Sequence, residues 1–297
     1  MNKILILSRY KSHSKNFLIF LPLLISNKSL NISFIDLVFP FCIFIFIASV
    51  IYVTNDFFDY KIDVNNKLKN NFLIKEVSFF KIFIFNIFLL FFILFLYFTK
   101  YFGYSLVFYV LIFYLYTFFF KKIKYLDITC LVSFHLLRLF YGAEVFKVQI
   151  SSWFIIFFGV IFIILAILKR INQINVNNLE TDNLIIPYDK KDIKNLELII
   201  ISLLFINFLF FIIYMLKDIY NFNYMFNSSN TPILNKYYYF TYSIIYFLFL
   251  IFIYKIIKKI KKNSLGKDIT EYIQTSKEFI LITLISFFLL VFIKFFT

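Results

Sequence analysis

Apolar residues run along this chain in long stretches that short polar segments separate. Each stretch has about twenty residues, the length that an α-helix needs to cross the hydrocarbon core of a bilayer. The pattern predicts nine spanning helices, at 16–32, 34–54, 79–98, 102–120, 126–146, 151–169, 197–216, 237–257 and 278–296. Pro40 lies inside the second, where a membrane helix tolerates it as a kink. We therefore predict an all-α, polytopic membrane bundle that forms a single domain over 1–297.

A cluster of carboxylates stands out against this pattern. Asp56, Asp59 and Asp63 directly follow about twenty mostly apolar residues. On a helix the three positions share one face, and Asn55 lies one turn from Asp59. Their mutual repulsion, increased by the negative end of the helix dipole, favours a cation among them. The spacing therefore predicts a metal site that holds a phosphorylated substrate at a membrane surface, and the alternative is a solvated loop face.

Composition supports the membrane interpretation. Apolar residues make up 62% of the chain and aromatic residues 24%, which is more than a soluble domain contains. The formal net charge of +15 would suggest a nucleic-acid partner in a soluble protein. Here the basic residues lie between apolar spans, where they set topology and contact anionic lipid. We expect membrane lipid and no nucleic acid among the partners.

The basic residues also predict an orientation. If the N-terminus is cytoplasmic, most of the 31 Lys and Arg residues fall in polar segments on the cytoplasmic side. This asymmetry follows the positive-inside rule. It places the N-terminus and the carboxylate stretch at the cytoplasmic face of the cytoplasmic (inner) membrane.

Further basic residues fall within or at the ends of predicted spans. Arg138 lies about three turns inside the fifth, a costly position unless it faces a cavity or a partner. It is a candidate phosphate ligand, and the alternative is an ion pair with Asp127 or Glu144. Lys169 and Arg170 close the sixth span, and their alternative role is a topology anchor. Carboxylates for Mg²⁺ with cations for phosphate oxygens suit a phosphorylated leaving group.

Several motifs resemble a known family. The N-D-x-x-D-x-x-x-D order at 55–63, in a nine-helix membrane bundle, resembles the first aspartate-rich motif of the UbiA prenyltransferase superfamily. Other stretches resemble its decaprenyl-phosphate phosphoribosyltransferase branch. Residues 9–16 keep the Arg and the Lys-Asn of that branch's R-P-x-x-W-x-K-N motif, with Tyr10 for Pro and His13 for Trp.

Later stretches follow in the order of the same branch. The branch's Y-S-x-x-L-K-x5-D motif is matched by Tyr116 to Lys121 with Asp127. Its L-R-x-x-x-G motif is matched by Leu137-Arg138 with Gly142. Its K-R-x-x-E-L motif is matched from Lys169-Arg170 onward, with Gln173 in place of Glu. Tyr188 corresponds to a tyrosine expected shortly afterwards. Two family motifs are changed, R-P-I near 71–73 and Arg-Tyr near 254–255.

The resemblance implies an activity and a set of site residues. The activity is transfer of a 5-phosphoribosyl group from phosphoribosyl pyrophosphate to a polyprenyl phosphate, with release of pyrophosphate. The catalytic residues, which would also hold Mg²⁺, are Asn55, Asp56, Asp59 and Asp63. The substrate-binding residues are Lys15, Asn16, Lys67, Lys69, Tyr116, Lys121, Asp127, Arg138, Lys169, Arg170 and Tyr188.

Two other functions stay open. The first is a UbiA-type prenyltransferase that moves a polyprenyl group from its diphosphate to an aromatic acceptor. That reaction uses a second aspartate-rich motif after the sixth span, where this chain has Lys169-Arg170 and then carboxylates diluted by lysines. The second is a transporter or channel with the carboxylates as its cation site, since intramembrane charges also mark ion paths.

Overall fold

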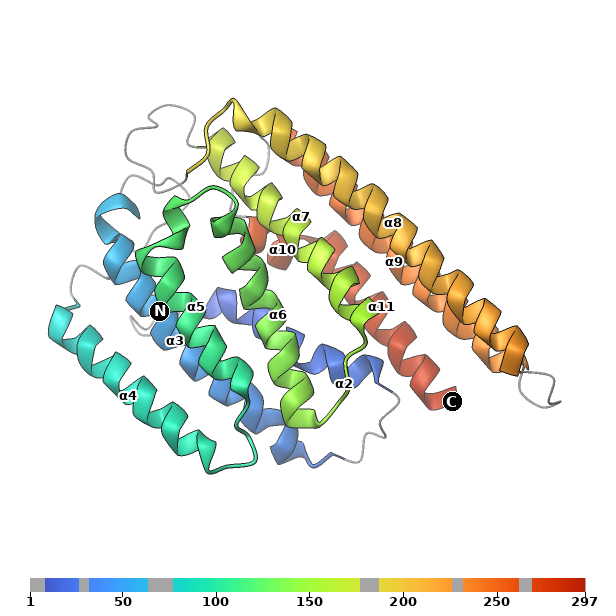
Figure 1. Ribbon diagram of the computed structural model, residues 1–297, viewed down its shortest axis with the longest axis horizontal. Helices are drawn as coiled ribbons and strands as arrows, with labels where there is room; N and C mark the ends of the chain where they lie inside the picture. The colour runs from blue at the N-terminus through green and yellow to red at the C-terminus, as the bar shows by residue number, and fades with distance from the viewer. Residues whose placement is uncertain are drawn as a thin grey trace. The chain divides into compact units, whose positions relative to one another are not determined.

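A computed structural model describes residues 9–26, 32–63, 77–176, 187–225, 232–261 and 269–296. Every regular element in these residues is a helix (Figure 1), which confirms the predicted all-α class. The chain divides into two compact units, Met1–Ile150 with Gln173–Asp192, and Ser151–Asn172 with Ile193–Thr297. The single domain over 1–297 stays a prediction.

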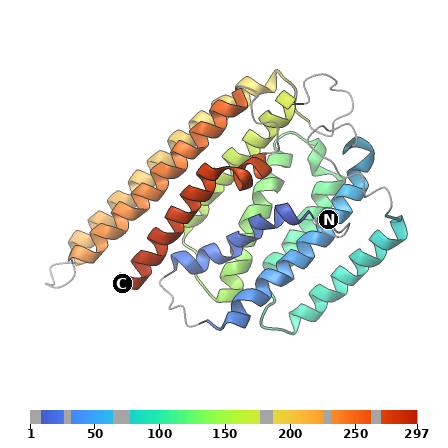
Figure 2. The same cartoon turned by 180° about the vertical axis from the view of Figure 1, so that it is seen from behind.

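The first unit contains seven of the described helices. They are η1 (Tyr10–Phe20), α2 (Leu21–Ile25), α3 (Phe34–Asp63), α4 (Phe79–Tyr97), α5 (Tyr104–Phe118), η3 (Phe120–Lys122) and α6 (Leu126–Phe146). η1 packs against both α3 and α6, α5 packs against α3 and α6, and α4 lies along α3 (Figures 1 and 2). η1 is thus held between the helix that carries the carboxylates and the helix that carries Arg138.

The remaining helices are α7 (Ser152–Val176), whose last residues belong to the first unit, α8 (Asp192–Met225), α9 (Pro232–Lys261), α10 (Ile269–Thr275) and α11 (Lys277–Phe296). α11 packs against α9 and α10, and α8 runs beside α9 in both views (Figure 2).

α3 is a continuous helix with a polar start and a polar end. The Ser33 hydroxyl donates to the Asp36 carboxylate at 2.9 Å, and the backbone N–H of Asp36 donates back to the hydroxyl at 3.2 Å. This reciprocal cap satisfies backbone donors that the first turn leaves without partners. Pro40 lies inside the helix without ending it, as expected for a membrane helix. α3 therefore extends through the carboxylate stretch to Asp63.

A close helix contact fixes η1 on α6. A Cβ atom at Gly142 would overlap the backbone carbonyl of Ile19, so only glycine permits this approach. Ile19 is fully buried, and Phe44, Tyr109 and Tyr141 are at most 1% exposed in the surrounding core. Gly142 thereby fixes how α6 and η1 are aligned, including the turn of each helix that comes before this contact.

Five of the described helices are long and apolar enough to cross a membrane: Phe34–Tyr60, Phe79–Tyr97, Leu126–Phe146, Ser152–Asn175 and Asp192–Tyr214. They correspond to the second, third, fifth, sixth and seventh predicted spans, and they indicate an integral membrane protein. The fourth predicted span forms the shorter apolar helix α5. α9 and α11 cover the eighth and ninth, and the total of nine spans stays a prediction.

The first predicted span, 16–32, differs from the structure. Helical structure begins earlier, at Tyr10, has 3₁₀ geometry as far as Phe20, and ends at Ile25. Ser26 is extended, and its hydroxyl donates to the carbonyl of Leu23. Hydropathy alone predicts an apolar α-helix over 16–32, whereas the contact of η1 with α6 is a tertiary feature that hydropathy does not report.

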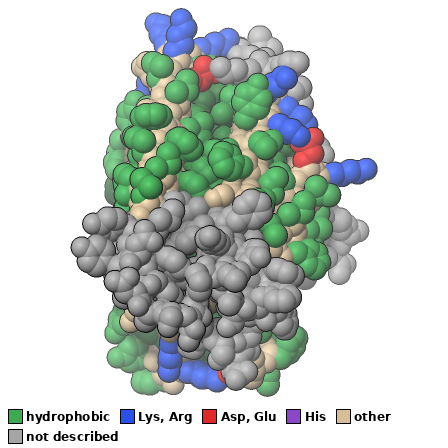
Figure 3. Space-filling model, turned by 90° about the vertical axis from the view of Figure 1, so that its right-hand side faces the viewer, with side chains coloured by type: hydrophobic (Ala, Val, Ile, Leu, Met, Phe, Trp, Pro, Cys, Tyr) green, Lys and Arg blue, Asp and Glu red, His purple; other side chains and the backbone are tan. Residues whose placement is uncertain are grey.

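Large apolar side chains cover much of the surface. On α4, Phe80, Phe91 and Phe95 are 68%, 66% and 64% exposed. Figure 3 shows another face on which the described side chains are mostly hydrophobic, with Lys and Arg near its two ends. Such surfaces are unfavourable in water and match contact with lipid chains.

Candidate functional site

The last turns of α3 carry the predicted carboxylate site. Because α3 is unbroken to Asp63, this stretch is helical, as its spacing predicts. Asp56 is 2% exposed and Asp59 is 5% exposed. Nδ2 of Asn55 donates to Oδ2 of Asp59 at 3.1 Å, which confirms the predicted contact across one turn. The Asp63 side chain lies outside the described residues, so its role in the site stays a prediction.

Two cations from distant parts of the chain lie against these carboxylates. Nε of Arg9 donates to Oδ2 of Asp56 at 2.7 Å, and a second nitrogen of the same guanidinium contacts Oδ1. Nζ of Lys121, on η3, pairs with Oδ1 of Asp59. A buried carboxylate requires such compensation. Protein side chains therefore relieve the repulsion expected along this face of α3.

Arg138 lies in the same unit and is 2% exposed. Its guanidinium donates to four neutral oxygens: Asn16 Oδ1 at 3.0 Å, the Phe134 carbonyl at 2.6 Å, the Tyr52 hydroxyl at 3.2 Å and the Tyr109 hydroxyl at 2.8 Å. The faces of Phe44 and Tyr109 also lie within 5.5 Å and 5.2 Å of its central carbon. Arg138 is thus a buried cation held by neutral groups.

The contacts of Asn16 determine which groups donate and which accept in a chain of hydrogen bonds that passes through η1. Because Nε of Arg138 can only donate, the amide oxygen of Asn16 faces it, and the Asn16 amide nitrogen faces Nδ1 of His13 at 3.2 Å. Nδ1 then accepts, and Nε2 carries the proton toward the Ser49 hydroxyl at 3.1 Å. Ser49 in turn donates to the carbonyl of Ile45. This order assigns His13 as the neutral Nε2–H tautomer.

The structure does not show the ion pair that was the alternative role for Arg138. Asp127, fully buried in the first turn of α6, accepts from the Tyr116 hydroxyl at 3.3 Å. Glu144 accepts from the backbone N–H and the hydroxyl of Ser105, at 3.2 Å and 2.5 Å. Within the described residues, none of the acceptors that contact Arg138 is a carboxylate.

Tyr188 is buried against the turn that precedes α6. Its hydroxyl accepts from the backbone N–H of Tyr125 at 2.6 Å, where Tyr125 has a left-handed φ of 66°. Nearby, Nζ of Lys124 pairs with Asp192 at 2.7 Å, and this hydrogen bond raises the pKa of Lys124 above its ordinary value. These contacts tie Tyr188 to the start of α6 and hence to the turn that carries Asp127.

The other predicted substrate-binding residues lie on other segments of the chain. Lys15 is half-buried on η1. Lys169 and Arg170 lie on α7 in the second unit, half-buried and buried respectively, and their role in the site stays a prediction. Lys67 and Lys69 fall outside the described residues.

Sequence reasoning did not assign a role to four residues of this site. Arg9 and Thr117 occupy positions within the motifs, and the Thr117 hydroxyl lies 3.5 Å from Oδ1 of Asn55. Tyr52 and Tyr109 gave no signal, because the chain contains 22 tyrosines and neither lies in a motif. Only the fold shows that both hydroxyls meet at Arg138.

The donor set on α3 suits Mg²⁺. Carboxylate oxygens of Asp56 and Asp59 and the amide oxygen of Asn55 are hard ligands of the kind that Mg²⁺ takes. Mg²⁺ keeps several waters or substrate phosphate oxygens in its shell, so a few protein ligands suffice. In the described part of the chain, no three or more side chains of His, Cys, Asp or Glu form a group that could hold a metal ion by themselves.

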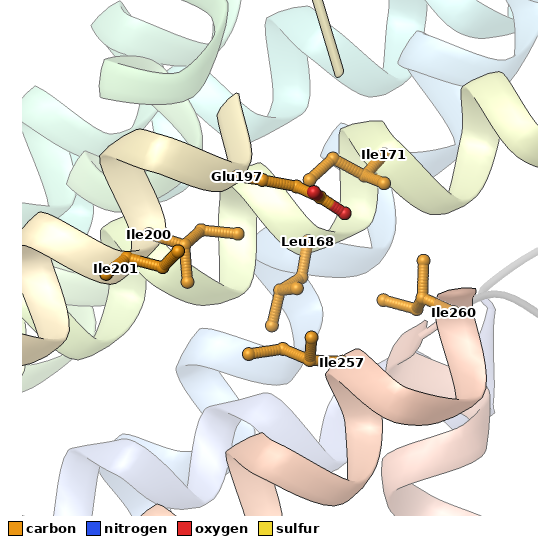
Figure 4. Close-up of a pocket in the computed structure, with 7 residues that line it drawn as sticks. All are labelled: Leu168, Ile171, Glu197, Ile200, Ile201, Ile257 and Ile260. Carbon is orange, nitrogen blue, oxygen red and sulfur yellow. The ribbon is translucent and has the colours of Figure 1, made fainter. Parts of the chain in front are cut away.

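The second unit contains a small cavity between α7, α8 and α9 (Figure 4). It is lined by Leu168, Ile171, Glu197, Ile200, Ile201, Ile257 and Ile260. Its volume of about 40 Å³ holds only a few water molecules, whereas small-molecule pockets start at about 300 Å³. This cavity is therefore too small to be a substrate site.

The chain was also compared with known proteins. No protein-family model matches it, and no curated protein matches it.

Proposed function

We propose that the chain is a Mg²⁺-dependent membrane transferase of the UbiA superfamily, with nine spans. It would transfer a 5-phosphoribosyl group from phosphoribosyl pyrophosphate to a polyprenyl phosphate. The observation that supports the proposal best is the pairing on α3 of buried Asp56 with Arg9 and buried Asp59 with Lys121. Carboxylates for a metal and cations for phosphate thereby share one site in an integral membrane protein.

The donor would bind at the end of α3. Asp56, Asp59 and Asn55, with Asp63, would hold Mg²⁺, which neutralises charge on the departing pyrophosphate. Arg9 and Lys121 lie against the same carboxylates and can donate to the phosphate oxygens. The pyrophosphate would thus leave into a site that already carries positive charge.

The acceptor reaction needs no general base. An oxygen of the polyprenyl phosphate attacks C1 of the ribose, while the bond from C1 to the pyrophosphate oxygen breaks and its electron pair leaves with pyrophosphate. The acceptor oxygen is already anionic at neutral pH, so no proton must be removed. Arg138 would supply positive charge for the lipid phosphate, which places it for attack, and a part for Lys169 and Arg170 stays a prediction from the sequence.

Lipid contact and orientation complete the proposal. The exposed apolar faces of helices such as α4 suit a polyprenyl chain, because apolar contact tolerates varied chain length. The positive-inside asymmetry supports an orientation in which the site would lie at the cytoplasmic face of the cytoplasmic membrane, where a water-soluble sugar donor is accessible.

A direct assay tests the proposal. Membranes that contain the protein, given Mg²⁺, phosphoribosyl pyrophosphate and a polyprenyl phosphate, should form a phosphoribosyl lipid that mass spectrometry detects. A product that forms only from a polyprenyl diphosphate and an aromatic acid would replace the proposal with prenyl transfer. Cation flux into vesicles without either product would favour a transporter.

A further inference from the structure

Among the described residues, each of the two buried carboxylates of α3 pairs with a cationic side chain. Arg9 precedes Asp56 by 47 residues in the chain, and Lys121 follows Asp59 by 62 residues. The four side chains carry two negative and two positive charges. These two pairs are therefore electrically balanced before any ligand binds.

We propose that Arg9 and Lys121 are exchangeable counter-ions that couple metal binding to diphosphate binding. When both ligands enter, the carboxylates change partner from the cations to the metal, and the cations change partner from the carboxylates to the phosphate oxygens. This inference rests on the donor site of the proposed function and adds the coupling to it.

Charge balance gives the coupling its sign. A divalent metal alone must displace Arg9 and Lys121, which leaves two cations without anions beside a further positive charge. A diphosphate alone must draw the cations away, which leaves Asp56 and Asp59 unpaired beside a further anion. Each of these states contains buried unpaired charge, which is strongly unfavourable. With both ligands present every charge has a partner, so each ligand strengthens the binding of the other.

The geometry of both cations suits an exchange. The Arg9 guanidinium grips Asp56 through two nitrogens, and the same fork fits a phosphate. The Arg9 side chain is 24% exposed, so it has room to turn. It also lies 5.8 Å from the centre of the Tyr52 ring, which would retain it in the site after it leaves Asp56. Lys121 carries its charge on a flexible stem from the short helix η3.

An ion pair at the other end of α3 offers a matched control. Lys100 pairs with Asp36, but the two side chains are 66% and 32% exposed. Because water solvates both partners, this pair contributes little and has no buried charge to exchange.

The experiment measures metal binding by the purified full-length protein in detergent. Protein-bound Mn²⁺ is followed by electron paramagnetic resonance, with and without inorganic pyrophosphate. In the unchanged protein, pyrophosphate should raise the Mn²⁺ affinity at least about tenfold, within the usual range of coupling between two sites. Arg9→Gln and Lys121→Gln should each strengthen binding of Mn²⁺ alone and reduce the enhancement by pyrophosphate severalfold.

Two further variants make the test specific. Arg9→Lys keeps the charge and should retain most of the coupling, while Lys100→Gln should change neither quantity. Unchanged or weaker Mn²⁺ binding in Arg9→Gln and Lys121→Gln, with the enhancement intact, would overturn the inference. If one variant fails to fold, as judged by size-exclusion chromatography, the other carries the same test.

The same data separate this inference from the proposed function. Coupled binding of Mn²⁺ and pyrophosphate without formation of any phosphoribosyl lipid would reject the sugar transfer and keep the exchange. Product formation without coupling would keep the transferase and reject the exchange.

Discussion

Arg138 illustrates how a single buried side chain can organise several helices. Four of the five N–H donors of a guanidinium are used, toward Asn16, Phe134, Tyr52 and Tyr109. A lysine has three donors at one point and cannot span these acceptors. None of these contacts is a carboxylate, and the proposed function assigns the charge to an anionic substrate. Positioning of its neighbours and the proposed attraction of phosphate are therefore separable roles.

The first role predicts a loss of stability in Arg138→Lys. The variant keeps a positive charge but loses the planar fork, so at least one of the buried oxygens of Asn16, Tyr52 and Tyr109 loses its donor. We expect the free energy of unfolding in detergent to fall by about 1–3 kcal/mol, the cost of an unsatisfied buried polar group. Lys122→Gln, at an exposed position on η3, is the control and should be neutral. Equal stability of the two variants would show that the Arg138 contacts are not structural.

Asp56 and Asp36 provide a second test, because both are aspartates on α3. Asp56→Asn removes a proposed metal ligand and should lower phosphoribosyl-lipid formation by at least about a hundredfold. Asp36→Asn changes the partly exposed pair with Lys100 and the hydrogen bonds from Ser33 and Tyr101, all at the other end of α3, and should leave the rate nearly unchanged. Product is measured by mass spectrometry on equal amounts of folded protein. Full activity of Asp56→Asn would rule out the metal role.

At the scale of the helix, the packing of η1 on α6 depends on the absence of a side chain at Gly142. In Gly142→Ala the new Cβ meets the backbone carbonyl of Ile19, which cannot rotate away as a side chain could. We expect a destabilisation of about 1–3 kcal/mol from overpacking, together with loss of activity as Asn16 moves from Arg138. The readouts are thermal unfolding and the lipid product.

Gly159 supplies the matched control for this substitution. It also lies within a helix, α7, but a Cβ there meets nothing within 4 Å. Gly159→Ala should be neutral or stabilising by up to about 1 kcal/mol, because alanine favours the helix. If the two glycine variants behave alike, the close contact with Ile19 does not matter for the fold.

The helices themselves show what the sequence could predict. Long apolar runs between polar segments located α4 and α6 almost to the residue, at 79–98 and 126–146 against Phe79–Tyr97 and Leu126–Phe146. The same reasoning could not find the 3₁₀ geometry of η1, because that segment is shaped by its contact with α6. Spacing placed Asp56, Asp59 and Asp63 on one face and Asn55 one turn from Asp59. Their pairing with Arg9 and Lys121 joins distant segments, and no local pattern reports it.

The surface of the whole molecule combines exposed apolar helices with a strong positive charge. Five described helices suit a bilayer, and the chain carries a formal net charge of +15. Charge in the polar segments predicts the orientation of the helices, whereas Arg9 and Lys121 pair with buried carboxylates and Arg138 is itself buried. The same residue types are therefore proposed to serve topology at the surface and ligand chemistry inside, and burial is what distinguishes the two groups.

Orientation in the membrane can be tested on one helix. α6 has 21 residues, and its rise of about 1.5 Å per residue spans the roughly 30 Å of a hydrocarbon core. Exposed Lys122 precedes it and exposed Lys147 follows it. After Cys42→Ser and Cys130→Ser, a membrane-impermeant thiol reagent on intact cells should label Lys147→Cys but not Lys122→Cys. Disrupted cells should label both, which is the control for reactivity.

Each pattern of labelling has a distinct meaning for the site. Labelling of Lys122→Cys alone in intact cells would reverse the orientation and place the adjacent Lys121 and Asp59 pair on the outer face, away from a cytoplasmic sugar donor. Labelling of both in intact cells would show that α6 does not cross the membrane. Labelling of Lys147→Cys alone is the expected result, because Lys121, Lys122 and Lys124 form a basic segment of the kind that stays cytoplasmic.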